Sequence, residues 1–242
     1  TGVTTIAAGT LAFGVGATGG TAGMVIGDIA NSGLVLFNRS DSIVYSSTIS
    51  GTGGIEKAGS GELTLNGAQV YGGSTTFTAG TMRVISAGSI GSGSFVFNGG
   101  RFTTSGNSAL SFANELLFTG SSSFGDTNAS YAGALTFSGN GVLTGDRSVT
   151  IDSPVTMSGV LSGTYSLTKA GDALLTLSGV NTYSGATNVN AGTLSLSGTL
   201  ASTVLSVASG ATLNAQNGSV IPTGAAVTAN GLVNLLNSAV TL

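Results

Sequence analysis

Hydrophobic and polar residues alternate along most of this chain, in short runs that are separated by turn residues. The runs at residues 62–66 (ELTLN), 94–98 (SFVFN) and 193–197 (TLSLS) show this pattern. A period of two with Thr, Val, Phe and Leu is typical of β-strands that bury one face. Asn-Gly pairs follow two of these runs, and both residues favour tight turns. The pattern predicts an all-β protein, in which residues 109–117 come nearest to a helical pattern.

A second, longer period relates one strand run to the next. Such a recurrence indicates stacked units, each of which covers the apolar face of its neighbour. We therefore predict a right-handed single-stranded parallel β-helix (a solenoid) of about 12 rungs, with about 19–20 residues in each. The large apolar residues that recur at this step, and that should form internal ladders, are Leu63, Met82 and Phe102; Leu116, Leu135, Val155 and Leu175; and Leu175, Leu194, Leu213 and Leu232.

The prediction covers residues 1–242 as one continuous β-helix, with less regular rungs in residues 1–50. In that region Leu11 and Leu34 stand farther apart than one regular rung. Residues 225–242 still read as strand and turn, so neither end resembles a cap, and we expect solenoid ends that can pair with further strands. The first residue is Thr1, and the sequence shows no charged segment followed by a short apolar core that would indicate a signal peptide. We expect a processed mature chain or an excised fragment.

Two segments of the chain repeat each other without a gap. Residues 51–84 (GTGGIEKAGSGELTLNGAQVYGGSTTFTAGTMRV) and 163–196 (GTYSLTKAGDALLTLSGVNTYSGATNVNAGTLSL) are identical at 15 of 34 positions, at an offset of 112. The shared residues include the pairs Lys57/Lys169 and Tyr71/Tyr183 and an Ala-Gly-Thr triplet. Self-similarity at a fixed offset indicates a repeat architecture, and these segments are its clearest copies.

The shared residues resemble the autotransporter-associated β-strand repeat. The resemblance lies in KAGSGELTLNG, YGGST and AGTM of the first copy and in LTKAG, NTYSG and AGTL of the second. It implies a β-helical passenger region of a large exported protein of a Gram-negative bacterium, at the cell surface or secreted. The resemblance also implies secretion through a C-terminal outer-membrane β-barrel, which would lie outside this chain.

Composition narrows the possible chemistry. Charged residues make up 6% of the chain, against roughly 25% in an average soluble domain. Because the chain has no Cys and no His, thiolate and zinc sites and a Ser-His-Asp triad are excluded. The six basic residues are spread thinly, so nucleic acid is not an expected partner. Residues 1–27 carry no charge, but they are rich in Gly and Thr and lack flanking cations, which argues against a membrane helix.

Two groups of residues could carry catalysis. A Ser–Lys dyad would need Lys57 or Lys169, but their equivalent positions favour turn lysines with the stem packed along the rung and the ammonium in water. Asp146, Arg147 and Asp152 form the nearest acidic grouping, as in β-helices that degrade pectin or bind calcium. The competing interpretation is a solvated loop with a local ion pair.

Two surface interpretations also remain open. Tyr71 and Tyr183 could form a sugar-binding platform, or they could stack at a corner of the solenoid with the hydroxyl in water. Threonines on one flat face could bind ice, although Thr is also the ordinary outward residue of a strand. The row in question comprises Thr64, Thr75, Thr76, Thr176 and Thr187.

The leading hypothesis is an extracellular structural or adhesive rod that acts by self-association or by adhesion to cells and surfaces. We expect no catalytic, cofactor-binding or metal-binding residues, no cofactor, and as partners other copies of the chain or surface glycans. The alternative is a carbohydrate-binding or polysaccharide-degrading β-helix with an acidic face near Asp146 and Asp152, walled by residues 107–128. A third hypothesis is a spacer that presents another domain.

Overall fold

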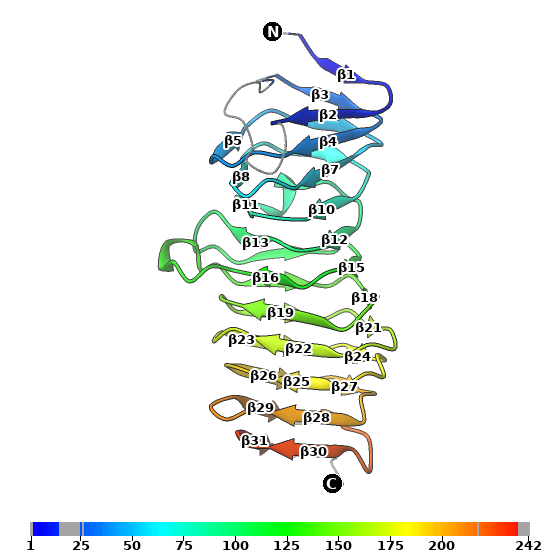
Figure 1. Cartoon of the computed structure of the whole chain (residues 1–242), viewed down its shortest axis with the longest axis vertical. Helices are drawn as coiled ribbons and strands as arrows, with labels where there is room; N and C mark the ends of the chain where they lie inside the picture. Colours follow the sequence, from blue (N-terminus) through cyan, green and yellow to red (C-terminus); the bar gives the residue numbers. More distant parts are fainter. Residues whose placement is uncertain (1, 15–24, 26, 217, 237–242) are drawn as a thin grey trace.

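The computed structural model describes residues 2–14, 25, 27–216 and 218–236, and in these residues the chain winds into a parallel β-solenoid of about 11 turns. Every pair of described strands is parallel, and β1 and β31 lie at opposite ends of the rod (Figure 1). The all-β class and the solenoid architecture predicted from the sequence are therefore confirmed. The right-handed sense of the winding stays a prediction.

Each complete turn supplies one strand to each of three faces, which we call faces 1, 2 and 3. Face 1 contains β1 (Thr4–Ile6), β3 (Ile29–Asn31), β6 (Ile49–Gly51), β9 (Val70–Tyr71), β14 (Leu110–Phe112), β17 (Leu135–Phe137), β20 (Val155–Met157), β23 (Leu174–Leu177), β26 (Thr193–Leu196), β29 (Thr212–Ala215) and β31 (Leu232–Leu235). Between β9 and β14 the short 3-10 helix η1 (Ala87–Ser89) takes the place of a strand.

The other two faces are built in the same way. Face 2 contains β2 (Thr10–Phe13), β4 (Leu34–Phe37), β7 (Gly54–Lys57), β10 (Thr75–Phe77), β12 (Phe95–Phe97), β15 (Leu116–Phe118), β18 (Gly141–Leu143), β21 (Leu161–Ser162), β24 (Val180–Asn181) and β27 (Thr199–Leu200). Face 3 contains β5 (Ile43–Tyr45), β8 (Glu62–Leu65), β11 (Thr81–Val84), β13 (Arg101–Thr104), β16 (Ser122–Phe124), β19 (Arg147–Ile151), β22 (Leu167–Ala170), β25 (Thr187–Val189), β28 (Val204–Val207) and β30 (Ala226–Ala229).

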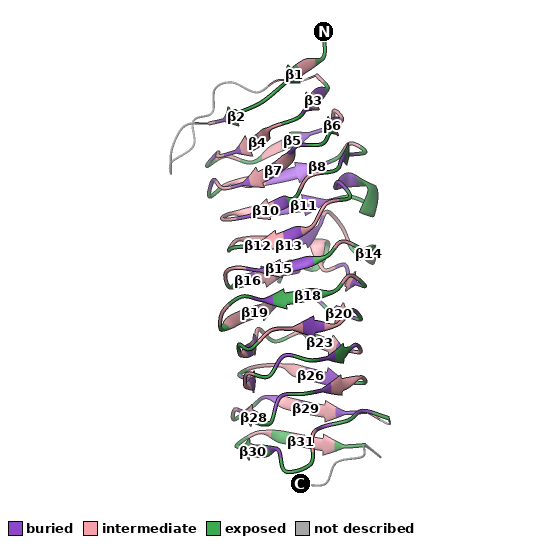
Figure 2. Cartoon of the chain, turned by 90° about the vertical axis from the view of Figure 1, so that its right-hand side faces the viewer, coloured by how far each residue is buried: buried purple, intermediate pink, exposed green. Residues whose placement is uncertain are grey.

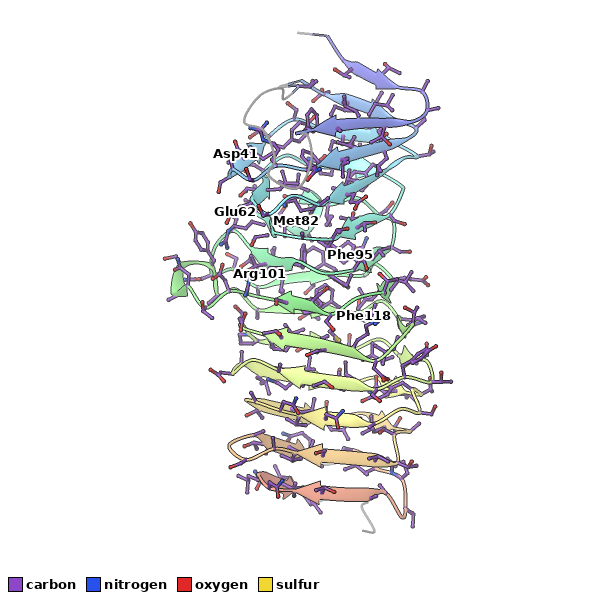
Figure 3. All side chains as sticks on the ribbon, in the orientation of Figure 1. Asp41, Glu62, Met82, Phe95, Arg101 and Phe118 are labelled. Atoms are coloured by element: carbon purple, nitrogen blue, oxygen red, sulfur yellow. The ribbon has the colours of Figure 1, made fainter. Side chains whose placement is uncertain are left out.

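The interior is formed by the inward residue of each strand, stacked on the equivalent residue of the next turn. On face 3 the strand register aligns Leu63, Met82, Phe102, Phe124 and Ile151. All five side chains are at most 1% exposed, and purple buried segments follow the strands in Figure 2. Figure 3 shows Met82, Phe95 and Phe118 within the rod. Because each ladder side chain is covered from both neighbouring turns, burial accumulates along the rod.

The predicted ladders are correct wherever the turns keep the regular period. Leu63, Met82 and Phe102 are in register, and so are Leu175, Leu194 and Leu213. The step from Leu213 is one residue off, because Leu213 pairs with Val233 and Leu232 pairs with Thr212.

The step from Leu116 to Leu135 is wrong. Leu116 lies in β15 on face 2, where it pairs with Phe95, whereas Leu135 lies in β17 on face 1, where it pairs with Leu110. In residues 1–50, Leu11 pairs with Val35 and Thr10 with Leu34. Residues 109–117 form β14 and the start of β15 rather than a helix.

The described residues contain two 3-10 helices of three residues each, η1 and η2 (Ala129–Tyr131). No helix among them is long and apolar enough to cross a membrane. Part of the uncharged stretch considered above as a membrane helix, residues 15–24 and 26, lies outside the described residues.

Candidate functional site

The two lysines of the repeat copies are buried within the solenoid, at 3% and 1% exposure. Lys57 Nζ donates to the carbonyl of Gly59 and, at 3.1 Å, to that of Ala79. Lys169 Nζ donates to Gly171 O at 2.5 Å and to Ala191 O at 2.9 Å. Each ammonium therefore joins its own turn to the next one, and the prediction of an ammonium in water is wrong.

Burial lowers the pKa of both lysines to about 8. Both lysines nevertheless stay mainly protonated at pH 7, and the backbone carbonyl oxygens accept hydrogen bonds from their ammonium groups. Within the described residues neither lysine contacts a serine hydroxyl, so the geometry gives no Ser–Lys dyad.

The Gly of the repeated Ala-Gly-Thr triplet packs close to the hydrogen bonds between the lysine and the backbone carbonyls. Gly80 and Gly192 have φ values of 66° and 59°, which favour glycine. A Cβ at Gly80 would stand 2.6 Å from Lys57 Nζ, and one at Gly192 would stand 2.5 Å from Asp172 O. The Lys and the Gly of each repeat are thus parts of one packed corner.

The repeat tyrosines are completely buried, at 0% exposure. Tyr71 Oη lies 2.6 Å from Thr75 Oγ1, and Tyr183 Oη lies 2.7 Å from Thr187 Oγ1. Burial raises the pKa of Tyr71 to about 12 and that of Tyr183 also above its ordinary value. Both interpretations from the sequence, a sugar platform and a corner with a hydrated hydroxyl, are therefore wrong.

The predicted threonine row does not form a surface. Thr64, Thr75 and Thr187 are buried, while Thr76 belongs to β10 on face 2 and Thr176 to β23 on face 1. No single flat face carries these five threonines.

The acidic grouping at residues 146–152 does not converge. Asp146 and Asp152 flank the two ends of β19, and the extended chain between them separates them by about 20 Å. Carboxyl groups that share a glycosidic bond lie about 5–10 Å apart. Asp146 Oδ1 accepts from the amide of Ser166, whereas Asp152 pairs with Arg101 at 2.6 Å. The described residues also contain no cluster of three acidic, His or Cys side chains that could hold a metal ion.

One segment departs from the solenoid and projects from it. Residues 125–134, here called the projecting segment, lie between β16 and β17 and contain η2 (Figure 1, green, beside β13 and β16). Arg83 Nη2 lies 2.6 Å from Asp126 Oδ2, and the Arg83 guanidinium stands 3.9 Å from the centroid of the Tyr131 ring. Arg83 Nε also pairs with Glu62 at 2.7 Å. The predicted wall at residues 107–128 is thus only partly right, because β14, β15 and β16 lie within that range and belong to the solenoid itself.

The ion pair between Arg83 and Asp126 changes the pKa of Asp126 as well as fixing the position of the projecting segment. Burial alone would raise the pKa of Asp126, but the Asn128 amide and the Arg83 guanidinium bring it below its usual value. Asp126 therefore stays charged down to acidic pH, and its ion pair with Arg83 is retained over the same pH range.

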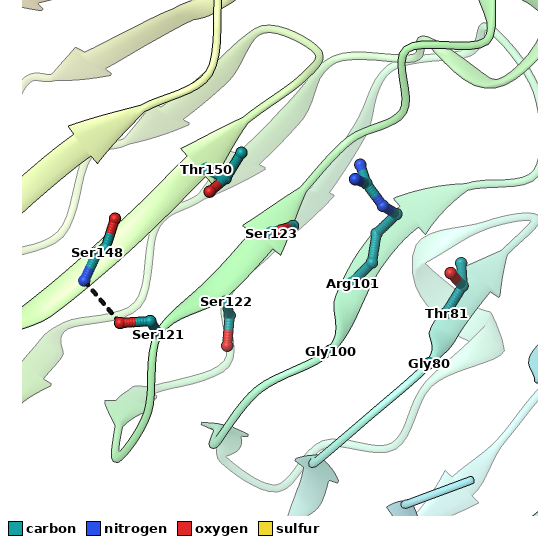
Figure 4. A pocket seen from close by; sticks show the side chains of 9 residues that line it. All are labelled: Gly80, Thr81, Gly100, Arg101, Ser121, Ser122, Ser123, Ser148 and Thr150. Carbon is teal, nitrogen blue, oxygen red and sulfur yellow. Dashed lines mark hydrogen bonds between the residues drawn. The ribbon is translucent and has the colours of Figure 1, made fainter. Parts of the chain in front are cut away.

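A shallow hollow of about 380 Å³ lies on face 3 beside the projecting segment. Strand register places Thr81, Arg101, Ser123 and Thr150 in one row across four successive turns, and Ser121, Ser122 and Ser148 complete its hydroxyl lining (Figure 4). Arg101 Nη1 donates to Gly125 O and Asp152 Oδ2, both at 2.6 Å. Sequence reasoning missed this row because the steps from Arg101 to Ser123 and on to Thr150 are longer than the regular period.

Comparison with known proteins shows that the two repeat copies match a known repeat family. Residues 55–84 and 167–196 match the passenger-associated-transport-repeat family. The chain is also 39% identical over 140 residues to the adhesin BmaC autotransporter of Brucella suis biovar 1 (strain 1330). That alignment covers 57% of this chain and 4% of the relative, so the chain spans a small part of the relative's length. No solved structure matches the chain. The chain thus carries two matched repeats on a continuous solenoid and is similar to a part of an autotransporter adhesin.

Proposed function

We propose that this chain is a segment of a rod-like adhesive passenger on a bacterial surface or in the secreted state, and that it acts by contact rather than by catalysis. The observation that carries the proposal is the continuous parallel ladder in a chain that is similar to an autotransporter adhesin. At about 4.8 Å per turn, 11 turns make a rod about 50 Å long. A rod of this kind can hold a contact surface away from the cell, because the same stacked turns form both the support and the surface.

The outer surface supports a contact function. On face 1 the strand register aligns Ser111, Thr136, Thr156 and Thr176 in an outward row. Such side chains can donate and accept hydrogen bonds, and they avoid the exposed apolar patches that cause non-specific aggregation. The separation of Asp146 from Asp152 removes the support for polysaccharide degradation.

Self-association is the second part of the proposal. Adjacent strands in this fold hydrogen-bond along their whole length, so a strand edge of one copy can add to an edge of another by β-augmentation. Lateral contact between the hydroxyl rows is the other geometry open to two rods.

Adhesion and self-association are tested with the same purified chain. Beads coated with the chain should attach to epithelial cells more than beads coated with heat-unfolded chain. Negative-stain electron microscopy over a concentration series should show rods about 50 Å long that join into longer or paired particles as concentration rises. Equal attachment of both bead types would refute adhesion, and single rods at every concentration would refute self-association.

A further inference from the structure

The hollow on face 3 has the chemistry of a saccharide site. We propose that it binds a neutral glycan chain lying parallel to the rod axis. This inference rests on the adhesive function proposed above and names the class of ligand that one face would recognise. The observations that support it are unused hydroxyl groups, a fixed guanidinium with free donors, and a linear spacing set by the strands.

The hydroxyls of the hollow divide into used and unused groups. Ser121 Oγ accepts from the Ser148 amide at 2.9 Å (Figure 4), and Ser122 Oγ bonds both backbone groups of Gly99. By contrast, the hydroxyls of Thr81, Ser123, Ser148 and Thr150 make no hydrogen bond within the part of the chain that the structure describes. A hydroxyl can both donate and accept, so these four groups complement a ligand that carries many hydroxyls.

Arg101 adds a directed donor to the same row. Asp152 and the carbonyl of Gly125 hold its Nη1, while Nε and Nη2 have no partner among the described residues. These two nitrogens form one edge of the planar guanidinium, and such an edge presents paired donors in a fixed geometry. Adjacent hydroxyl oxygens of a pyranose ring can accept from both.

The charge of the hollow favours a neutral ligand. The Arg101–Asp152 pair is neutral as a unit, and Glu62, which is in register with Thr81, is paired with Arg83. Polyanions are recognised by unpaired, clustered cations, and the described residues of this row include none. They also include no aromatic or aliphatic side chain, so an apolar peptide does not fit the chemistry.

The geometry favours a linear chain. The row from Thr81 to Thr150 crosses four strands, which gives a length of about 14 Å. The spacing between strands is close to the length of one sugar unit in an extended chain, so successive units can meet successive turns. The hollow volume of about 380 Å³ lies within the usual range for small-ligand sites. Arg101 joins the hollow to Gly125, the first residue of the braced projecting segment, so this edge is fixed before a ligand binds.

The test uses the complete 242-residue chain with cellotetraose and chitotetraose as neutral probes and a heparin tetrasaccharide as the anionic probe. Isothermal titration and saturation-transfer NMR measure binding. We expect a neutral tetrasaccharide to bind and the heparin fragment not to bind. The double variant Ser123→Ala/Thr150→Val should weaken binding at least fivefold, because it removes two unused hydroxyls and leaves the remaining contacts in place.

Thr76→Val is the matched control, because it makes the same change at the outward position of β10 on face 2, outside both hydroxyl rows. It should leave saccharide affinity unchanged, and all variants should keep the melting temperature of the parent chain. Absence of neutral saccharide binding, binding of heparin alone, or equal affinity of the double variant would overturn the inference. The bead assay with the same variants separates the two proposals: attachment without saccharide binding removes the glycan inference alone, and saccharide binding without attachment removes the adhesive function.

Discussion

At the residue scale, the repeat sequence is explained by polar groups that are buried and satisfied. Lys57 and Lys169 each join two turns through backbone carbonyls, and Tyr71 and Tyr183 each pair with the Thr four residues later. Buried polar groups are costly unless they are hydrogen-bonded, so each of these residues needs its partner. The repeat therefore retains pairs in both of its copies: Lys with Gly, and Tyr with Thr.

The Tyr–Thr pair can be tested by a double-mutant cycle. Tyr183→Phe leaves the buried Thr187 hydroxyl without a partner, and we expect a loss of about 1–3 kcal/mol in the free energy of unfolding. Adding Thr187→Val removes the orphaned hydroxyl and should recover part of that loss. Urea denaturation of the parent, both single variants and the double variant measures the coupling. Strictly additive losses would show that the two hydroxyls do not interact.

The buried lysines predict an unusual pH dependence. An unfolded lysine has a pKa near 10.5, whereas Lys57 and Lys169 have pKa values of about 8. Between these values the unfolded chain holds more protons, so stability should rise with pH. The comparison is best made from pH 7.5 to about 9.5, because above that range the unfolded tyrosines ionise and reverse the trend.

The control for this prediction is the double variant Lys57→Met/Lys169→Met, which has neither titrating group. The free energy of unfolding of the parent chain should increase with pH relative to that of the variant. Parallel pH profiles would mean that the carbonyls fully offset the cost of burying the charge.

At the element scale, the solenoid supplies a regular support and the projecting segment supplies the irregular feature. Arg83 connects β11 to Asp126 and Tyr131, and Asn107 Oδ1 accepts from the Ala132 amide at 3.0 Å. Contacts from several turns therefore hold a loop whose residues 127–130 are exposed. Loops positioned by a rigid scaffold commonly carry binding functions, so we expect the brace to fix the exposed loop in place and to contribute little to overall stability.

The brace can be released without altering the ladders. Arg83→Met removes both the ion pair and the contact with the Tyr131 ring, and we expect local stability to fall by about 1–3 kcal/mol. Hydrogen exchange should become at least about tenfold faster in residues 125–134 and stay unchanged in β22 to β29. Arg147→Met is the control, because Arg147 contacts Phe118, Asp146 and Thr144 and not the segment. Equal exchange in both variants would contradict the role given to Arg83.

The success of sequence reasoning varied with the regularity of the elements. A constant step along the chain made the ladder of Leu175, Leu194 and Leu213 readable. From Phe102 to Ile151 the steps are longer, because the loop before β14 and then the projecting segment insert residues between strands. In this region the period is no longer constant. For that reason Leu116 was wrongly assigned to the ladder of Leu135, and the row around Arg101 was not recognised. The buried lysines were missed for another reason, since composition gives no sign that backbone carbonyls will surround an ammonium.

At the scale of the whole molecule, the rod is a chain of neighbouring turns with an uneven interior. The aromatic side chains concentrate in the middle, where the ring of Phe97 lies 4.8 Å from that of Phe77, 5.4 Å from Phe118 and 4.7 Å from Phe124. From β22 onward the ladders consist mainly of Leu and Val. In a solenoid each turn is stabilised by its neighbours alone, so the central aromatic turns couple the two halves of the rod.

This coupling leads to a prediction about cooperativity. Phe97→Ala removes a ring that contacts three turns and should cost about 3–5 kcal/mol. We expect the parent chain to unfold in a single urea transition. Because the loss in the variant falls on the middle interfaces, the turns on either side should begin to unfold separately, and the transition should broaden or split. Hydrogen exchange resolved by turn would identify which half opens first. Leu213→Ala, a similar truncation near one end, should lower stability without splitting the transition. A single sharp transition for Phe97→Ala would mean that the backbone ladders alone carry cooperativity along the rod.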